Sequence, residues 1–294
     1  MNVLAIDIGG TKVALGLLQA GVLTERKQIP TPAVTTADAF ADEILQACRP
    51  WLVQADCIGV STTGVVTEAG ITAINPVTLA FPAPFPLQAA LQSQTQLPVS
   101  MLNDAQAAAW YEYQRLDGKY RNMAYLTVST GIGGGLVIDG KLHTGAQNFA
   151  GHIGHTVIDR FGPLCGCGQT GCAEATASGT AIQTLARKLI SSSIRNPELF
   201  DMAPEHAQAE AIIQNSAQAV ATLCANLKAT LDLEVIVLGG GIGLAAGYLE
   251  RVKQHLAAKP PFFQVELVAA QGDHDACLLG AACLHTRLAS GASQ

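Results

Sequence analysis

The sequence predicts an α/β protein built from two duplicated lobes with a cleft between them. Along the 294 residues, runs of apolar and β-branched residues alternate with segments of helical spacing, which is typical of the α/β class. Two stretches, 3–17 and 125–138, share one pattern: an apolar strand, a small polar residue, a glycine-rich turn and a second apolar strand. One such hairpin can be an accident of folding, but two in one chain indicate a duplicated lobe.

The first lobe is expected to begin with a small sheet. Its apolar runs are separated by the tight turn at Gly9–Lys12, and two runs around a glycine turn predict a β-hairpin. Thr35 or Thr36 is a suitable N-cap for the helix that follows. The stretch 69–103 holds no charged residue but five prolines, which is typical of an ordered binding loop. We predict strands at 3–8, 13–18, 22–29, 57–60 and 99–102, and helices at 36–52 and from Asn103–Asp104 through Trp110.

The second lobe is expected to follow a surface turn at 117–120. Its glycine turn, at 130–134, lies between two predicted strands, and the segment 145–179 has no regular pattern. The closing helix is expected to pack back on the first lobe, so that the lobes comprise 1–117 plus 276–294, and 118–275. We interpret Asp273, His274 and Asp275 as turn and cap residues before that helix. We predict strands at 124–129, 135–138, 235–238 and 263–268, and helices at 180–191, 205–231, 244–256 and 276–288.

The composition excludes several classes of protein. Apolar residues make up 49% of the chain and charged residues 14%, which excludes a disordered protein. The net charge of −6 argues against a nucleic-acid binder, because such proteins need a basic face. The best candidate for a membrane span, 235–249, is shorter than the ~20 residues that a spanning helix needs and is interrupted by glycines. The N-terminus lacks the basic segment of a signal peptide, so we expect a soluble, cytoplasmic protein with no membrane partner.

The glycine-rich turns are candidate binding sites for a nucleotide. Backbone N–H groups approach phosphate oxygens closely only where no Cβ intervenes. In the first turn, Gly9 and Gly10 allow that approach, Thr11 and Lys12 offer donors, and Asp7 can hold Mg²⁺ through water. A plain hairpin turn is the alternative for each loop taken alone. The other candidate loops are Ser129–Gly135 and Leu238–Gly241.

Other nucleotide-binding motifs fit less well. The sequence contains no Gly-x-x-x-x-Gly-Lys-Ser/Thr, so a P-loop enzyme is not expected. The segment 241–246 does match the Rossmann fingerprint, and Glu266 could serve as its ribose-binding acid. However, too little of the chain remains after this segment for the two mononucleotide-binding halves of such a domain.

Four residues of the irregular segment form a candidate metal site. The pattern His-x₉-Cys-x-Cys-x₄-Cys supplies three thiolates and one imidazole, which satisfy tetrahedral Zn²⁺ without an open position. Such a set marks a structural zinc rather than a catalytic one. Reduced cysteines in a loop are the alternative, and His152 competes with His155 as the fourth ligand because spacing alone does not choose between them. The predicted ligands are His155, Cys165, Cys167 and Cys172.

The sequence resembles the ROK family of bacterial sugar kinases and repressors over essentially its whole length. The resemblance is carried by Asp-Ile-Gly-Gly-Thr-Lys at 7–12, Ser-Thr-Gly-Ile-Gly-Gly-Gly at 129–135, Gly-His-Ile-Gly-His at 151–155 and Cys-Gly-Cys-Gly-x-x-Gly-Cys-x-Glu at 165–174. It implies the duplicated actin/hexokinase-like fold, which is ribonuclease H-like, and it implies His155 as the zinc ligand. The ATP-binding residues that it implies are Ala5, Ile6, Asp7, Ile8, Gly9, Gly10, Thr11, Lys12, Gly131, Ile132, Gly133, Gly134, Gly135, Gly239 and Gly240.

The resemblance also implies a sugar site and a catalytic base. Phosphoryl transfer to a sugar hydroxyl needs a carboxylate that accepts the departing proton. Asp104 is the candidate, although an N-cap role is a common alternative for Asp at a helix start. Most ROK sugar kinases carry Glu at the position of His152, and a neutral imidazole offers only one acceptor, so we expect this exchange to suit a C2 acetamido group. The predicted substrate-binding residues are Thr63, Gly64, Asn103, Asp104, His152, His155 and Glu174.

The reaction that the resemblance implies is the ATP-dependent phosphorylation of N-acetyl-D-mannosamine at its 6-hydroxyl, in sialic acid catabolism. Mg²⁺ on the phosphates and a structural Zn²⁺ that pins the substrate loop are the expected cofactors, and a homodimer is the expected assembly. A ROK-type glucokinase or another hexose kinase is the alternative, followed by a non-catalytic sugar-binding regulator. A repressor of the family would carry a helix-turn-helix segment, for which the strand expected at residue 3 leaves no room.

Overall fold

The computed structural model describes residues 1–74, 81–272 and 275–286, and contacts divide the chain into two units. Unit 1 comprises Met1–Asp117, Thr144–Phe149 and Gly272–Gln294, and unit 2 comprises Gly118–His143 and Ala150–Gln271. The division expected from the sequence differs in two places. It assigned 144–149 to the second lobe, and it began the last segment of the first lobe at residue 276.

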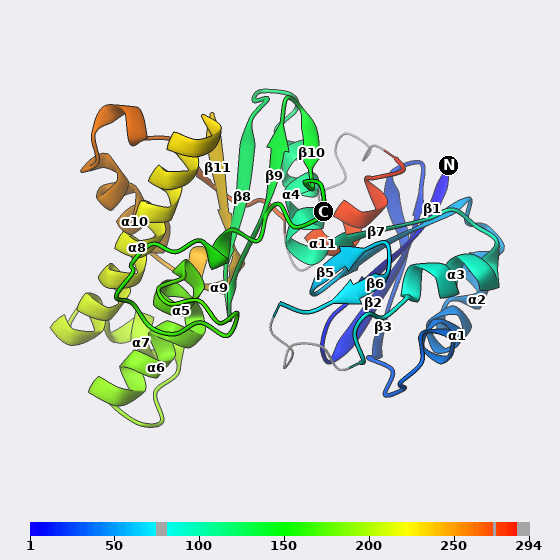
Figure 1. The fold of residues 1–294 in the computed structure, drawn as a ribbon, viewed down its shortest axis with the longest axis horizontal. Coiled ribbons are helices and arrows are strands. Elements are labelled where there is room, and N and C mark those ends of the chain that lie inside the picture. Colours follow the sequence, from blue (N-terminus) through cyan, green and yellow to red (C-terminus); the bar gives the residue numbers. More distant parts are fainter. Residues whose placement is uncertain (75–80, 273–274, 287–294) are drawn as a thin grey trace. The chain divides into compact units, whose positions relative to one another are not determined.

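Unit 1 is built around a five-stranded mixed sheet in the order β3-β2-β1-β4-β7 (Figure 1). The strand β1 pairs antiparallel with β2 and parallel with β4, and the pairs β2–β3 and β4–β7 continue these two directions. The strands are β1 (Asn2–Ile8), β2 (Lys12–Gln19), β3 (Val22–Pro30), β4 (Cys57–Thr62) and β7 (Val99–Asn103), with a separate hairpin of β5 (Val65–Thr67) and β6 (Gly70–Thr72).

Unit 2 repeats this architecture. Its five strands follow the order β10-β9-β8-β11-β12, in which β8 takes the place of β1: it pairs antiparallel with β9 and parallel with β11. The shared order and directions confirm the predicted α/β class and the duplication. The strands are β8 (Met123–Val128), β9 (Ile132–Ile138), β10 (Lys141–His143), β11 (Val235–Gly239) and β12 (Glu266–Ala269).

The sheet of unit 1 is covered on both faces. Leu4 and Ile6 of β1 pack in the cluster that includes residues of α1 and α3, whereas Val3 and Ala5 pack in the cluster that includes residues of α11. Because successive side chains of a strand point to opposite faces, an unbroken apolar run is required here. The helices are α1 (Ala37–Ala47), α2 (Arg49–Leu52), α3 (Leu87–Thr95), α4 (Asp104–Arg115) and α11 (Ala276–Ala282).

Most helices of unit 2 gather on one side of its sheet (Figure 1). The long helix α8 packs its buried stripe, which includes Ile213, Val220 and Leu227, against strand residues such as Leu126 and Ile236. Buried residues that recur at helical spacing in this way are typical of the core-facing side of a helix. The helical segments are η2 (Ile153–His155), α5 (Ala173–Ala177), α6 (Gly179–Leu189), α7 (Asn196–Met202), α8 (Ala207–Leu231), α9 (Gly240–Gly243), α10 (Tyr248–Ala257) and η3 (Pro261–Phe263).

Several predicted elements were wrong or incomplete. The predicted binding loop 69–103 contains β6 and the helix α3, although its residues 75–80 lie outside the described part of the chain. The helix α7 was not predicted, and the predicted strand 263–268 begins only at Glu266, after η3. The predicted helix 244–256 begins later, as α10, and the short α9 lies before the predicted range.

The second glycine-rich segment was also assigned incorrectly. The turn covers only Ser129–Gly131, because Val128 already pairs with Ile132 across the hairpin. Ile132, Gly133 and Gly134 therefore belong to β9 rather than to the predicted turn, whereas Gly135 lies in a strand as predicted. Glycine is required at 134 for a different reason: a Cβ there would lie 2.6 Å from the backbone oxygen of Tyr125 and 2.4 Å from Ile153 Cδ1.

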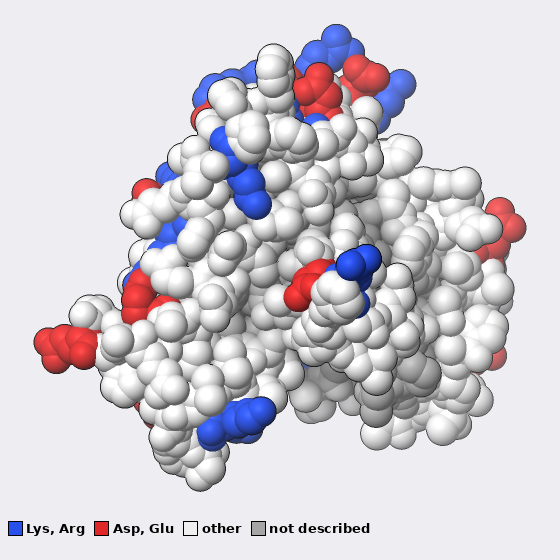
Figure 2. Space-filling model, turned by 60° about the vertical axis from the view of Figure 1, so that its left-hand side comes forward, with Lys and Arg blue, Asp and Glu red and all other residues white. Residues whose placement is uncertain are grey.

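The surface agrees with the composition. On the face drawn in Figure 2, lysine and arginine side chains are scattered among acidic ones rather than gathered into one basic patch. None of the helices in the described ranges combines the length and the apolar character that crossing a membrane requires.

Candidate active site

The first glycine turn joins β1 to β2 and is held by hydrogen bonds from Thr31. Gly9 N donates to Lys12 O at 3.0 Å, which closes the turn. Thr31 Oγ1 donates to Gly9 O at 2.7 Å, and Thr31 N donates to Thr11 O at 3.1 Å. A Cβ on Gly10 would contact nothing within 4 Å, so the space beside this exposed residue is open. Thr31 was not among the site residues predicted from the sequence.

The other predicted residues of β1 lie inside the protein. Ala5 and Ile6 have no exposed surface and Ile8 has 3%. Only their backbone groups could therefore contribute to binding, since their side chains form the core. Thr11 and Lys12, by contrast, are exposed at the turn.

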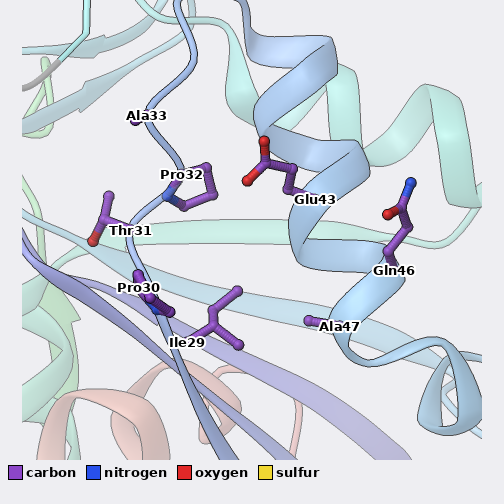
Figure 3. A pocket seen from close by; sticks show the side chains of 8 residues that line it. All are labelled: Ile29, Pro30, Thr31, Pro32, Ala33, Glu43, Gln46 and Ala47. Carbon is purple, nitrogen blue, oxygen red and sulfur yellow. The ribbon is translucent and has the colours of Figure 1, made fainter.

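Thr31 also lines a surface hollow between the end of β3 and α1. Figure 3 shows Glu43 of α1 pointing toward Pro32 in the loop that also carries Thr31. The glycines of the turn do not line this hollow.

Asp7 and Ser61 lie side by side at the ends of β1 and β4, where the register pairs them. Ser61 Oγ donates to Asp7 Oδ1 at 2.7 Å. Burial raises the pKa of Asp7 to about 6; the Ser61 hydrogen bond opposes this rise, and the carboxylates of Asp104 and Asp275 add to it. Ser61 was missed by the sequence analysis, and its place directly opposite Asp7 becomes visible only once the strands are paired.

Asp104 occupies the first position of α4, and its neighbour Asn103 is the N-cap. Asn103 Oδ1 accepts from Ala105 N at 3.0 Å, and Gln106 completes a capping box. Asp104 Oδ1 accepts from Ala105 N at 2.8 Å, and Thr63 Oγ1 donates to Asp104 Oδ2 at 3.2 Å. The capping role considered for Asp104 thus falls mainly to Asn103. Burial raises the pKa of Asp104, and the hydrogen bonds from Ala105 and Thr63 counteract that rise.

The loop after β4 meets the start of α4. Asn103 Nδ2 donates to Gly64 O at 2.9 Å, so Thr63, Gly64, Asn103 and Asp104 form one cluster. Gly64 has φ +97°, and a Cβ there would lie 2.6 Å from Thr72 O. A residue with a side chain would therefore be strained at position 64.

Two residues at the start of α11 complete this part of unit 1. Burial raises the pKa of the Cys277 thiol well above its usual value, and the nearby carboxylates of Asp7 and Asp104 add to the rise. Asp275 binds Arg26 of β3 through both carboxylate oxygens at 2.8–3.0 Å. Asp275 occupies the N-cap position of α11, as interpreted from the sequence, but its side chain makes no capping hydrogen bond there. His274 and Asp273 lie outside the described residues.

The second glycine turn, Ser129–Gly131, is held by two elements of unit 2. Glu174 Oε2 accepts from Ile132 N at 3.0 Å. On the α6 side, Gly179 N donates to Ser129 O at 2.7 Å, and Thr180 N donates to Thr130 O at 3.1 Å. The structure thus brings Glu174, predicted for the sugar, to the hairpin predicted for ATP.

A hollow of about 630 Å³ lies beside this turn. It is lined by residues that include Ser129, Thr130, Gly179, Asn196, Gly241 and Ile242. The predicted residues Gly239 and Gly240 immediately precede this lining. Gly240 has φ +86° and lies so close to β8 that a Cβ would be 2.4 Å from Val128 O.

The four predicted zinc ligands come together in unit 2. One ligand atom from each of His155, Cys165, Cys167 and Cys172 lies within 4.8 Å of the others. Cys165 Sγ is 3.6 Å from His155 Nδ1, and Cys167 Sγ is 3.6 Å from Cys172 Sγ. Ligands at about 2.0–2.3 Å from a tetrahedral Zn²⁺ would be roughly 3.5–3.8 Å apart, so the donor set fits this ion. Of the two histidines that spacing left open, His155 belongs to the cluster.

The zinc loop depends on one close backbone contact. Gly171 has φ +80°, and a Cβ there would lie 1.5 Å from Asp159 O, so no other residue fits.

His152 precedes η2 and is half-buried. Burial and the nearby imidazole of His155 lower the pKa of His152 to about 4.

Comparison with known proteins identifies the family. The sequence matches the ROK family over residues 3–287. The chain belongs to the ROK family. It is 60% identical over 284 residues to the N-acetylmannosamine kinase of Vibrio vulnificus (strain YJ016), covering 96% of this chain and 97% of that protein. It is 46% identical over 285 residues to the N-acetylmannosamine kinase of Escherichia coli O6:K15:H31 (strain 536 / UPEC), covering 97% and 98%.

Solved ROK structures share the fold. The ROK hexokinase from Thermus thermophilus matches with a TM-score of 0.83 and 33% identity, over 96% of this chain and 97% of that one. A ROK family glucokinase from Streptomyces griseus, in complex with glucose and AMPPNP, matches with a TM-score of 0.78 and 26% identity, over 97% and 99%. The predicted family and its actin/hexokinase-like fold are thus confirmed.

Proposed function

We propose that this ROK protein is a sugar kinase that transfers the terminal phosphate of ATP to the 6-hydroxyl of N-acetyl-D-mannosamine. The observation that carries the proposal is the 60% identity, over nearly the whole of both chains, to an enzyme with that substrate in its name. The residues expected to perform the reaction are present, and each group of them is held by hydrogen bonds in its own unit.

We assign the ATP phosphates to the two glycine turns and the adenosine to the hollow beside the second. The open side of Gly10 leaves room for a phosphate oxygen against the backbone. The hollow continues from Ser129 and Thr130 to Ile242, which gives a base and ribose a partly apolar lining next to the turn. The glucokinase relative solved with AMPPNP supports ATP as the donor.

We assign the catalytic base to Asp104. A sugar hydroxyl becomes a better nucleophile when a carboxylate accepts its proton during transfer. Thr63 and the Ala105 N–H orient this carboxylate, and their hydrogen bonds favour its ionised form against the effect of burial. Asn103, Gly64, His152, His155 and Glu174 are the further residues that we assign to the sugar.

We assign Mg²⁺ to Asp7. Carboxylate oxygen is the donor that this ion prefers, and it is commonly held through water beside the phosphates of a nucleotide. When bound, the ion neutralises charge on the transferring phosphoryl group. Ser61 fixes the orientation of the Asp7 carboxylate, so that one oxygen is held by the protein.

We assign a structural Zn²⁺ to the His155 and cysteine cluster. When bound, the ion ties the loop 165–172 to η2 and to the start of α5. Two residues assigned to the sugar lie beside the ligands: Glu174 is two positions after Cys172, and His152 three before His155. The bound ion would hold Glu174 and His152 in place by fixing this loop. It would not act on the substrate itself, because a closed site has no open position for chemistry.

We further propose that the protein acts as a homodimer in sialic acid degradation. The family resemblance supports this assembly, and the substrate supports the pathway. Light scattering coupled to size-exclusion chromatography tests the mass: twice 30.5 kDa is expected, and a mass of one chain contradicts the dimer.

A coupled assay of ADP release tests the function. The purified protein is supplied with ATP, Mg²⁺ and one of four sugars: N-acetylmannosamine, N-acetylglucosamine, glucose or mannose. We expect the highest kcat/KM with N-acetylmannosamine and a 6-phosphate product. A higher kcat/KM with glucose supports the glucokinase alternative, and no turnover of any of the four contradicts the proposal.

A further inference from the structure

Glu174 contacts the second glycine hairpin, and the hairpin is shaped to receive it. The Glu174 Oε2 accepts from Ile132 N at 3.0 Å. A Cβ on Gly131 would lie 2.5 Å from the same oxygen and 3.3 Å from Glu174 Cδ. A glycine at 131 therefore leaves the space that the carboxylate fills.

The segment that carries Glu174 holds the rest of the turn as well. Ser178 ends α5 and caps α6, so Glu174 and Thr180 lie on two helices joined by a single residue. Thr180 Oγ1 donates to Thr130 O at 2.8 Å. One short segment thus contacts the turn at both of its ends. Glu174 is therefore in direct contact with the hairpin at Ile132, next to Gly131.

The chemistry of a carboxylate allows two contacts at once. Its two oxygens offer several acceptor positions, and only Oε2 is needed for Ile132 N. Oε1 can accept a hydroxyl proton of a sugar at the same time. A sugar bound in this way would hold the carboxylate, and with it the hairpin, in one position.

We propose that Glu174 is a positioning residue that couples the binding of sugar to the binding of nucleotide. Sugar held by Glu174 fixes the Ser129–Gly131 turn in advance, so the nucleotide loses less conformational entropy on binding. By linkage, the nucleotide tightens the binding of the sugar by the same factor. The inference rests on the proposed function, which places a sugar hydroxyl at Glu174.

Calorimetric titration tests the coupling. The Kd of AMPPNP is measured with and without saturating N-acetylmannosamine for the wild type, Glu174→Ala and Gly131→Ala. We expect the sugar to tighten AMPPNP binding by about fivefold or more in the wild type and to have no effect in either variant. Gly131→Ala is the sharper variant, because Glu174 is still present and its carboxylate is merely displaced by the new Cβ.

The double variant serves as a control for steric damage. In the Glu174→Ala background, no carboxylate opposes the Cβ of Gly131→Ala, so we expect the double variant to bind AMPPNP as Glu174→Ala does. A further loss of affinity in the double variant would show that the alanine harms the hairpin by itself and would overturn the assigned fit.

Amide hydrogen exchange tests the contact without any ligand. We expect slow exchange at Ile132 in the wild type and in Glu174→Gln, whose side-chain carbonyl still accepts, and fast exchange in Glu174→Ala. Equal exchange in the wild type and Glu174→Ala overturns the contact. If both ligands bind the wild type independently, the coupling is overturned and the proposed function stands; if N-acetylmannosamine does not bind, the proposed function fails and the coupling fails with it.

Discussion

Ser61 Oγ donates a 2.7 Å hydrogen bond to Asp7 Oδ1 across the paired ends of β4 and β1. Burial nevertheless raises the pKa of Asp7 from 3.8 to about 6, with a further contribution from the carboxylates of Asp104 and Asp275. The folded chain therefore holds a proton on Asp7 at pH values where the unfolded chain has lost it. Between about pH 4 and pH 6, this carboxylate makes stability fall as the pH rises.

The variant Asp7→Asn is expected to remove this pH dependence. Without Mg²⁺ or nucleotide, the free energy of unfolding of the wild type should fall relative to Asp7→Asn between pH 4 and pH 6, and the difference should level off above that window. Urea unfolding at a series of pH values provides the measurement. Ser61→Ala should extend the window to higher pH, because it removes a hydrogen bond to the ionised form. A difference that stays constant from pH 4 to pH 8 would contradict this explanation.

Gly10→Ala is expected to weaken ATP binding without unfolding the protein. The Cβ would meet no neighbouring atom, so the change in stability should stay within about 0.5 kcal/mol. The same methyl group would occupy the space assigned to a phosphate oxygen. Losing one hydrogen bond to a charged group, worth about 1.5–3 kcal/mol, should raise the KM for ATP roughly ten- to a hundredfold. The KM for the sugar is the internal control; an unchanged KM for ATP would remove this turn from the nucleotide site.

The cysteine cluster is expected to bind one zinc ion per chain. Cys167→Ser should lose the metal and lower the thermal unfolding midpoint, because a structural zinc contributes folding free energy. Cys48→Ser is the matched control, since Cys48 lies in the core of unit 1 and its thiol donates to Ile44 O. Inductively coupled plasma mass spectrometry measures the zinc content of each variant. Full zinc content in Cys167→Ser, or none in the wild type, would contradict the assignment.

His152→Glu is expected to shift the substrate preference toward glucose. The histidine is half-buried and neutral, because burial and His155 lower its pKa to about 4, and it offers at most one acceptor. A glutamate offers several, which suits two neighbouring sugar hydroxyls. We expect the ratio of kcat/KM for N-acetylmannosamine to that for glucose to fall by about tenfold or more. The exposed residue His143 gives the control His143→Glu, and an equal ratio in all three proteins would show that His152 does not select the sugar.

The helices and strands that were predicted correctly are those that the residue pattern of a short stretch of sequence determines. The first hairpin followed from apolar runs around Gly9 and Gly10, and the helix at Thr36 followed from its cap, since Thr36 Oγ1 does accept from Ala39 N. The helix α3 was missed because prolines and the absence of charge masked the helical spacing of Leu87, Ala90 and Leu91, which are buried. That spacing was the signal that could have revealed it.

The contacts that hold the site could not be predicted from local pattern. Glu174 is 42 residues from Ile132, and Arg26 is 249 residues from Asp275. Such pairs form only after the strands and helices have packed. The family motifs placed Glu174 at the sugar, but nothing in its neighbourhood in the sequence pointed to the hairpin. Likewise, the glycine at 134 looked like a turn residue, whereas it makes room for Ile153.

The most direct test of the catalytic assignment is the rate of the variant Asp104→Asn. The amide keeps the shape of the side chain and the hydrogen bond from Ala105 N, but it cannot accept the departing proton. We expect kcat to fall by about 10²–10⁴-fold, while the Kd for N-acetylmannosamine, measured by calorimetry, changes by less than about threefold. Turnover close to that of the wild type would contradict the role of Asp104 as the base and, with it, the proposed mechanism.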